Sequence, residues 1–243
     1  MKKDVIGLIP ARMESTRFPG KPIYNINGKP MIWWVYNQAK KCENIDEIFV
    51  VTPNEEIRAT CEQYDLPCMF NKRQGKTAAE KLSLEIDNIE ADIILNIQGD
   101  EPLLNPNSLN QIINELQNNQ QEYYVGLVSL IEDETEFNDY NVVKTVLNKD
   151  GYAMYFSRSP IPNKFEYGYA LRVLGLYGYR KWFLEKYKNH SQTKTEMLEG
   201  NIEMIRMLEQ GYKIKFLHTI YNTIGVDKKE QVESVEKILR KKK

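Results

Sequence analysis

Short apolar runs alternate with amphipathic helical stretches through the first half of the chain, and this alternation constrains the fold more than any other feature. The runs expected to form strands cover residues 5–9, 47–52, 67–70 and 92–97. Near-continuous apolar strands separated by helices are typical of a parallel sheet covered on both faces. The pattern therefore predicts an α/β fold with a doubly wound, mostly parallel, Rossmann-like sheet.

Each expected connecting helix has a start signal. Pro30 stands where a first-turn proline belongs, Asn54 precedes two glutamates as an N-cap, and Asn105 precedes a proline in the same role. The inner face of the helix after Asn105 is expected to consist of Leu109, Ile112, Ile113 and Leu116. These signals predict helices after residues 30, 54 and 105.

The pattern changes after about residue 120. Strand-like runs at 124–131, 142–147, 152–156 and 169–179 are separated by turns, which predicts a mixed or antiparallel addition. We then expect helices near 181–189 and 196–210, a strand at 213–218, and a last helix from Asp227. The aromatic-rich stretch 152–187 packs either internally or against a second copy, and we expect a homodimer. Residues 1–243 are predicted to form one domain, with a dimerisation or acceptor-binding subregion at about 150–212.

Composition excludes several classes of protein. The formal net charge of −1 gives no global field for nucleic acid or an anionic membrane. The three cysteines and two histidines lack the spacing of a zinc site or a disulfide framework. The first apolar run is too short for a signal peptide or a membrane span, so we expect a cytoplasmic protein without membrane insertion. The basic run 240–243 is interpreted as a solvated helix end.

A basic loop follows the first strand directly. It carries Arg12, Arg17 and Lys21, with Gly20 allowing a tight turn. Arginine offers paired donors to phosphate oxygens, lysine offers a movable charge, and ligands of open α/β sheets collect at the carboxyl ends of strands. The loop therefore predicts an anion site, most simply for a nucleoside triphosphate. An ordinary exposed basic loop is the alternative, since neither G-x-x-x-x-G-K-S/T nor G-x-G-x-x-G is present.

Acidic residues follow two later strands. Asp100 and Glu101 stand in Gln-Gly-Asp-Glu-Pro after the run 92–97, and Asp227 follows Gly225 and Val226. Mg²⁺ commonly takes one or two protein carboxylates together with phosphates and waters. Asp100 and Asp227 are therefore candidate metal ligands. The alternatives are a turn-capping role for Asp100 and an N-cap of the last helix for Asp227.

Seven blocks in this order closely resemble the 3-deoxy-manno-octulosonate (Kdo) cytidylyltransferases, also called CMP-Kdo synthetases. The blocks are residues 9–22, 26–32, 96–103, 141–146, 151–162, 174–180 and 225–227. The resemblance covers nearly the entire chain. It implies a Mg²⁺-dependent enzyme in which the anomeric oxygen of an acidic 3-deoxy sugar attacks the α-phosphate of CTP and pyrophosphate leaves. The product would be an activated sugar for lipopolysaccharide or capsule.

The resemblance also implies roles for individual residues. The nucleotide would contact Pro10, Ala11, Arg12, Lys21, Thr77, Lys81 and Asp100. Among these, Arg12, Lys21 and Asp100 would be catalytic. The acceptor would contact Arg17, Gln98, Arg158, Tyr177 and Glu203, and the metal would bind Asp100 and Asp227.

Four departures from the family pattern concern the two substrates. Pro53 and Asn54 follow Thr52 where the family usually has Thr-Asp, and 77–81 reads Thr-Ala-Ala-Glu-Lys in place of Ser-Gly-Thr-Asp/Glu-Arg. Residues 77–81 are interpreted as a loop that the missing glycine stiffens. Val173 replaces a histidine, and Met204 replaces a glutamine. Unpaired acceptor hydroxyls would cost roughly 1–3 kcal/mol each, unless neighbours such as Arg172, Tyr177 or His190 contact them.

Three interpretations remain open beside a Kdo cytidylyltransferase. The first keeps the reaction and changes the acceptor to another acidic sugar or related acid. The second is a nucleotide-binding paralogue without activity, against which the retained cations and acids argue. The third is a dinucleotide-dependent dehydrogenase, which lacks its glycine fingerprint here.

Overall fold

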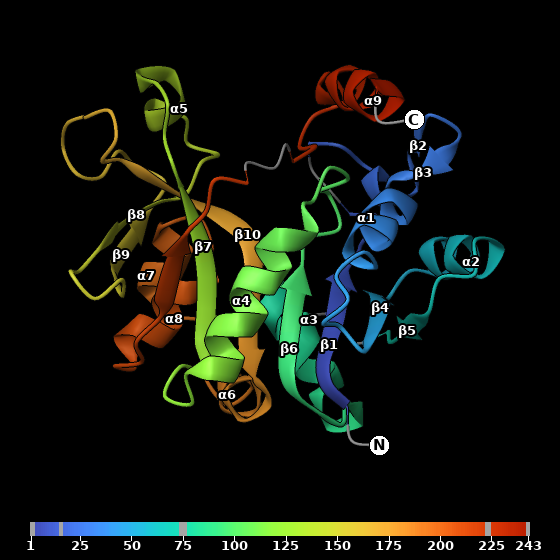
Figure 1. Ribbon diagram of the computed structural model, residues 1–243, viewed down its shortest axis with the longest axis horizontal. Coiled ribbons are helices and arrows are strands. Elements are labelled where there is room, and N and C mark those ends of the chain that lie inside the picture. Colours follow the sequence, from blue (N-terminus) through green and yellow to red (C-terminus); the bar gives the residue numbers. More distant parts are fainter. Residues whose placement is uncertain (1–2, 15–16, 73–76, 222–224, 242–243) are drawn as a thin grey trace.

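A single twisted sheet organises the computed structural model, which describes residues 3–14, 17–72, 77–221 and 225–241. Along the sheet the main strands are β11 (Lys215–His218), β7 (Tyr124–Leu130), β10 (Leu171–Arg180), β6 (Ala91–Ile97), β1 (Lys3–Pro10), β4 (Glu47–Thr52) and β5 (Cys68–Phe70). Only β10 runs antiparallel to both of its neighbours in this path, β6 and β7 (Figure 1). The predicted mostly parallel sheet is therefore confirmed.

Helices cover both faces of the sheet. One face packs against α1 (Met31–Ala39), α2 (Glu55–Gln63) and α4 (Pro106–Asn118). The other face packs against α3 (Ala78–Glu85), α6 (Lys181–Tyr187) and α8 (Glu203–Glu209). Alternate residues of β1 enter the two cores, Val5 and Ile9 the first and Ile6 and Leu8 the second. This two-sided burial explains why the central strands are almost wholly apolar.

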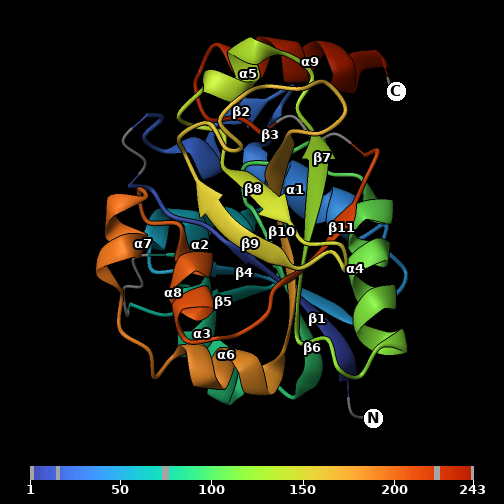
Figure 2. The ribbon, with the colours of Figure 1, turned by 90° about the vertical axis from the view of Figure 1, so that its left-hand side faces the viewer.

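An antiparallel hairpin extends the sheet in the second half of the chain. It consists of β8 (Lys144–Leu147) and β9 (Ala153–Ser157), and β8 also pairs with β10. Figure 2 shows the hairpin in front of the sheet, with α8 and α7 (Lys194–Leu198) beside it. The shorter elements are η1 (Lys21–Ile23), β2 (Asn25–Ile26), β3 (Lys29–Pro30), η2 (Ile86–Asn88) and α5 (Glu134–Asn138). The predicted antiparallel addition is confirmed.

The single helix expected over 196–210 is wrong. The structure has α7 and α8 there, separated by a tight connection in which Gly200 and Asn201 have φ of 73° and 63°. Two successive residues in the left-handed region cannot continue an α-helix. Thr193 caps α7 and forms a capping box with Glu196, so this helix also begins earlier than expected.

Residues 77–81 begin a helix, which corrects their interpretation as a loop. Thr77 is the N-cap of α3, and its side chain and that of Glu80 form a capping box. The absence of a glycine here therefore does not stiffen a loop. The helix signal, Thr-x-x-Glu, was present in the sequence.

The other helix starts match the sequence in part. Asn105 caps α4 and accepts a hydrogen bond from the Asn107 amide, as predicted. Pro30 is the residue before α1 rather than a member of its first turn. Asn54 occupies the N-cap position of α2, but its side chain bonds elsewhere. None of the helices within the described ranges is long and apolar enough to cross a membrane.

The last helix, α9 (Gln231–Lys241), begins four residues later than expected. The Gln231 side chain accepts hydrogen bonds from the amides of Asp227 and Lys228 at 2.7 and 2.8 Å. The N-cap interpretation of Asp227 is therefore wrong. Residues 15–16 of the block 9–22 and residues 242–243 of the basic run 240–243 lie outside the described residues.

Candidate active site

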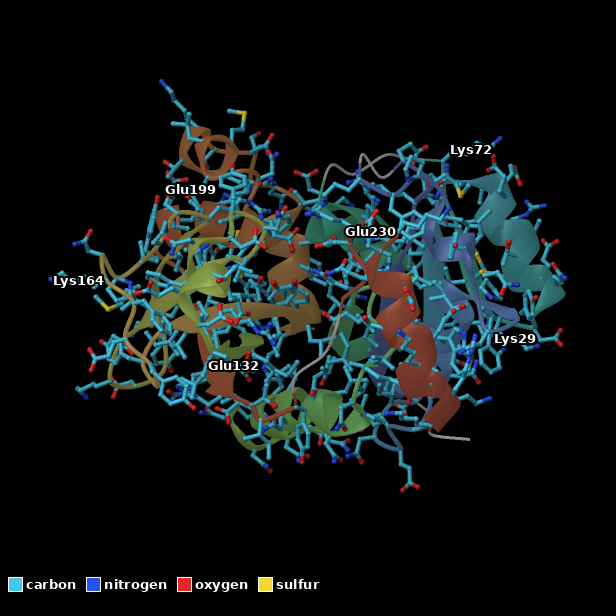
Figure 3. The ribbon with its side chains drawn as sticks, turned by 90° about the horizontal axis from the view of Figure 1, so that it is seen from above. Lys29, Lys72, Glu132, Lys164, Glu199 and Glu230 are labelled. Atoms are coloured by element: carbon cyan, nitrogen blue, oxygen red, sulfur yellow. The ribbon has the colours of Figure 1, made fainter. Side chains whose placement is uncertain are left out.

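Two adjoining cavities lie at the edge of the sheet where β1 and β6 end. Their volumes are about 780 and 400 Å³, and they share linings that include Arg17, Gln98, Asn141, Arg158 and Tyr177. Figure 3 looks down on this edge, where α9 separates a half that carries Glu199 and Lys164 from one that carries Lys29 and Lys72. The position agrees with the rule that ligands of α/β sheets bind beyond the carboxyl ends of the strands.

The basic loop is fixed to its surroundings at several points. The Ala11 amide donates to the carbonyl of Val51 at 2.9 Å, immediately after β1 ends at Pro10. The Asn54 Oδ1 atom accepts from the Met13 amide at 3.1 Å, and the Asn54 Nδ2 atom donates to Glu14 at 3.0 Å. Gly20 has a φ of 72°, which a residue with a side chain rarely adopts. Arg12 is exposed and lines the larger cavity, and Arg17 lines both.

Lys21 lies between the two acids that the sequence singled out. Its Nζ atom is 2.5 Å from Asp100 Oδ2 and 3.6 Å from Asp227 Oδ1. Arg17 Nη2 contacts the same Asp227 oxygen at 2.9 Å. The amide of Val226 donates to the carbonyl of Asp100 at 2.9 Å, which holds the two acidic segments together. The structure therefore brings Arg17, Lys21, Asp100 and Asp227 into one cluster.

This cluster suits a hard cation. Two carboxylates converge on one positive group, and carboxylate oxygens are the ligands that Mg²⁺ prefers. Among the residues that the structure describes, no group of three or more His, Cys, Asp or Glu side chains could hold a metal. A Mg²⁺ ion bound through two carboxylates and through substrate phosphates needs no larger group.

Gly99 allows the acidic turn to lie close to the basic loop. A Cβ atom on this residue would be 3.0 Å from the carbonyl oxygen of Pro10. Backbone contacts this close are rare for a residue with a side chain. Close packing against the Pro10 carbonyl therefore explains why a glycine precedes Asp100.

Four of the five expected acceptor residues line both cavities, namely Arg17, Gln98, Arg158 and Tyr177. Arg158 Nη1 donates to the carbonyls of Tyr140 and Asn141, both at 3.2 Å, and the guanidinium lies over the Tyr140 ring. Gln98 packs against Gly175, where a Cβ atom would lie 2.3 Å from the Gln98 side chain. Tyr177 is buried, and burial raises the pKa of its hydroxyl. These contacts fix the positions of Gln98 and Arg158, and Tyr177 is enclosed by its surroundings.

Glu203 joins the acceptor side to the first turn of α3. Its Oε2 atom accepts a hydrogen bond from the Ala79 amide at 3.0 Å. Burial raises the pKa of the Glu203 carboxyl, while the bonds from Ala79 and Thr77 lower it. Thr77 and Glu203 line the same, larger cavity. The two residues that the sequence assigned to different substrates therefore lie together.

The pKa of the Lys81 side chain is lowered. Burial is the main cause that lowers its pKa to about 8, the nearby Arg12 guanidinium adds to this, and Glu14 opposes it. Pro10, Ala11, Lys21 and Lys81 are absent from the linings of the two cavities, which consist of described residues. Lys21 is instead paired with Asp100 and Asp227.

The two apolar replacements also face the cavities. Val173 lines the smaller cavity and Met204, which is almost fully buried, lines the larger one. Arg172 is held by Glu136 and Ser129, each at 2.7 Å. His190 is absent from the described linings, and its carbonyl accepts from Arg206. Of Arg172, Tyr177 and His190, the three neighbours expected to contact the acceptor hydroxyls, Tyr177 is the one that lines both cavities.

Sequence reasoning missed the wall formed by residues 139–142. Tyr140 and Asn141 line the larger cavity, and Asp139, Asn141 and Val142 line the smaller. Asn141 stands at the start of the block 141–146, so a signal for it was present. Nothing local showed that Arg17, 124 positions earlier, would donate a hydrogen bond to its side chain.

The doubly wound sheet, with a basic loop facing two carboxylates at its carboxyl edge, defines a nucleotidyltransferase. The family model described as cytidylyltransferase matches residues 6–223. The chain belongs to the cytidylyltransferase family.

Curated relatives and a solved structure match over nearly the whole length. The 3-deoxy-manno-octulosonate cytidylyltransferase of Geotalea uraniireducens is 38% identical over 98% of this chain and 99% of its own. The protein of the same name from Thermodesulfovibrio yellowstonii is 36% identical over 96% and 97%. The structure of CMP:2-keto-3-deoxy-manno-octonic acid synthetase complexed with CTP matches with a TM-score of 0.91, 29% identity and coverage of 99% and 100%.

Proposed function

We propose that this enzyme transfers CMP from CTP to the anomeric hydroxyl of Kdo, giving CMP-Kdo and pyrophosphate. The observation that carries the proposal is the cluster in which Lys21 contacts both Asp100 and Asp227 beside Arg17. The curated relatives named as Kdo cytidylyltransferases support the choice of both substrates. The solved relative complexed with CTP supports the nucleotide.

The cations are proposed to hold the triphosphate. Arg12 and Lys21 would contact its oxygens, with Pro10, Ala11, Thr77 and Lys81 around the nucleotide. The anomeric oxygen forms a bond to the α-phosphorus, the bond from this phosphorus to the bridging oxygen breaks, and pyrophosphate leaves with the electron pair. The hydroxyl proton is lost to solvent. Such a transfer needs alignment and positive charge more than covalent help from the protein.

The acceptor is proposed to bind in the shared part of the cavities. Arg17 and Arg158 supply guanidinium donors for its carboxylate, and guanidinium matches carboxylate geometry. Gln98, Tyr177 and Glu203 offer polar groups for its hydroxyls. This placement puts the acceptor between the basic loop and the wall 139–142.

Mg²⁺ is proposed as the cofactor, held by Asp100 and Asp227. When bound there, the ion would neutralise triphosphate charge and lower the pKa of the attacking hydroxyl. Lys21 keeps the two carboxylates facing the same point.

A second acceptor class is favoured by a specific observation. Val173 and Met204 present apolar surface to the two cavities. A less hydroxylated acidic sugar, or another acid of similar length, would leave fewer hydroxyls unpaired against these side chains. An inactive paralogue fits the site less well, because the acids and cations lie within contact distance of one another.

A homodimer and cytoplasmic action complete the proposal. The aromatic-rich stretch divides in two: Tyr177, Tyr179 and Tyr187 are buried, whereas Tyr167 and Tyr169 are 77% and 59% exposed. Met154, on the outer hairpin, is 64% exposed. A second copy covering these side chains would remove apolar surface from water. Sedimentation equilibrium that shows only monomer would contradict the dimer.

The function is tested with the purified full-length protein, CTP, MgCl₂ and Kdo. We expect pyrophosphate release that depends on both substrates, and a product with the mass of CMP-Kdo. Other nucleoside triphosphates and a panel of acidic sugars serve as controls. Rapid turnover of another acid, with Kdo at background, would reject Kdo and retain the class. No pyrophosphate release with any acid would reject the activity.

A further inference from the structure

Lys144 is a fully buried lysine whose ammonium group donates hydrogen bonds to three backbone carbonyls of the described chain. Its Nζ atom donates to the carbonyls of Asp139 at 2.9 Å and Val142 at 2.8 Å, and to the carbonyl of Arg158. An ammonium group has three N–H donors, so each donor has an acceptor. A buried charge is costly unless it is hydrogen-bonded in this way. Such an arrangement needs a structural or functional reason.

The three carbonyls belong to two segments that form the cavity walls. Asp139 and Val142 lie on the wall 139–142, and Arg158 directly follows β9 and lines both cavities. Arg158 returns the contact, since its guanidinium donates to the carbonyls of Tyr140 and Asn141. Lys144 and Arg158 therefore tie the same two segments together from opposite directions.

A line of hydrogen bonds leads from this wall to the acidic cluster. The Asp139 carboxylate accepts from the amide and the side chain of Asn141, at 2.8 and 2.9 Å. The Asn141 side chain accepts in turn from Arg17, and Arg17 contacts Asp227. The wall that Lys144 holds is thus part of the same connected structure as the expected metal ligands.

We propose that Lys144 is a positioning residue that fixes the wall 139–142 and Arg158 at the distance the acceptor requires. It touches neither cavity directly and acts through Asn141 and Arg158. The expected effect on the KM for the acceptor rests on the proposed function. The expected effect on the order of the wall 139–142 does not depend on which acceptor is used. Misplacement of a positioning wall affects binding and alignment of the substrate that it contacts.

The main test compares Lys144→Met with Lys181→Met in the full-length protein. Lys181 is the matched control, because its Nζ atom also donates to a backbone carbonyl, that of Ile89, away from both cavities. In hydrogen exchange without substrates, we expect the amides of 139–143 to exchange about tenfold faster in Lys144→Met than in the wild type. We expect no such change in Lys181→Met. Equal exchange in wild type and Lys144→Met would overturn the proposal.

Kinetics separate this inference from the proposed function. We expect the KM for Kdo to rise about fivefold or more in Lys144→Met while the KM for CTP stays within about twofold. An equal rise in both KM values, or the same acceptor effect in Lys181→Met, would reject the positioning role. If the wild type does not use Kdo, the proposed substrate fails, and hydrogen exchange still decides this inference.

Asp139→Ala provides a second variant in case Lys144→Met does not fold. Asp139 is exposed, so its truncation leaves no buried hole, but it frees Asn141 from the wall. We expect faster exchange at 140–142 and a smaller rise in the KM for Kdo. Unchanged exchange at these amides would show that the wall does not depend on this network.

Discussion

Lys21 and Asp100 form an ion pair across 79 positions of sequence, with Nζ 2.5 Å from Oδ2. Both side chains are largely shielded from solvent, at 12% and 23% exposure. The pair joins the loop after β1 to the turn after β6, and these two strands are parallel neighbours in the sheet. A cation of the expected triphosphate site and a carboxylate of the expected metal site are thereby placed side by side.

Asp100→Asn is expected to lower kcat about 10²–10³-fold, the loss typical of removing one electrostatic contact to a transition state. The amide is nearly isosteric, so we expect the thermal melting temperature to change little. Pyrophosphate release at saturating CTP and Kdo measures the effect. The control is Asp150→Asn, the same change at an exposed residue outside both cavities. Activity within about twofold of wild type in Asp100→Asn would remove this residue from the catalytic group.

CTP affinity is expected to weaken as the pH rises through the pKa of Lys81, which is about 8. The protonated side chain attracts the triphosphate, and an anion bound beside it raises its pKa. The dissociation constant should therefore increase above pH 8 with a slope approaching about tenfold per pH unit. Titration calorimetry between about pH 7 and 9.5 measures this slope.

Lys81→Arg is the control for this pH dependence, since its guanidinium stays charged throughout the range. The same slope in this variant would assign the titration to another group.

The stability of the folded protein should rise with pH over the range in which CTP affinity falls. The ordinary pKa of 10.5 lies above the folded value, so the unfolded chain binds more protons between these limits. The free energy of unfolding should therefore gain from this group as the pH rises from about 8 to 10.5.

Arg206→Met is expected to lower the free energy of unfolding by about 3–5 kcal/mol, because it leaves buried carboxylate without its partner. The Arg206 side chain is 2% exposed, and it contacts Glu196 and Glu80, both at 2.7 Å. Urea denaturation measures the loss. Lys237→Met is the control, because it removes an exposed ion pair with Glu233, and such pairs contribute about 0–1 kcal/mol. A similar small loss in both variants would contradict a structural role for the buried cluster.

Met204→Gln is expected to sharpen discrimination among acidic acceptors. An apolar wall rejects an analogue that lacks a hydroxyl only weakly, whereas a polar site left unpaired rejects it strongly. We expect the wild type to use Kdo and a deoxy analogue with kcat/KM values within about tenfold of each other. In Met204→Gln the ratio of kcat/KM for Kdo to kcat/KM for the deoxy analogue should rise by about tenfold, which is the effect of one hydrogen bond. An unchanged ratio would place Met204 away from the acceptor hydroxyls.

Local signals in the sequence predicted much of the fold, and where they failed the cause is identifiable. The strands at the centre of the sheet were recognised because burial on both faces makes them continuously apolar. The start of α3 was misread although Thr77 and Glu80 form the capping box that their spacing permits. The break between α7 and α8 depends on the left-handed conformations of Gly200 and Asn201, which apolar periodicity does not reveal.

The sequence by itself determined the class of the fold, the basic loop and the acids after the strands, because these depend on local periodicity and on the rule that parallel strands end at one edge. Only the tertiary structure decided which of those groups meet. Arg17 reaches Asp227 across 210 positions, and Lys144 satisfies carbonyls on two different segments. Contacts of this kind arise from how strands are ordered and how loops pack, so no short stretch of sequence contains them.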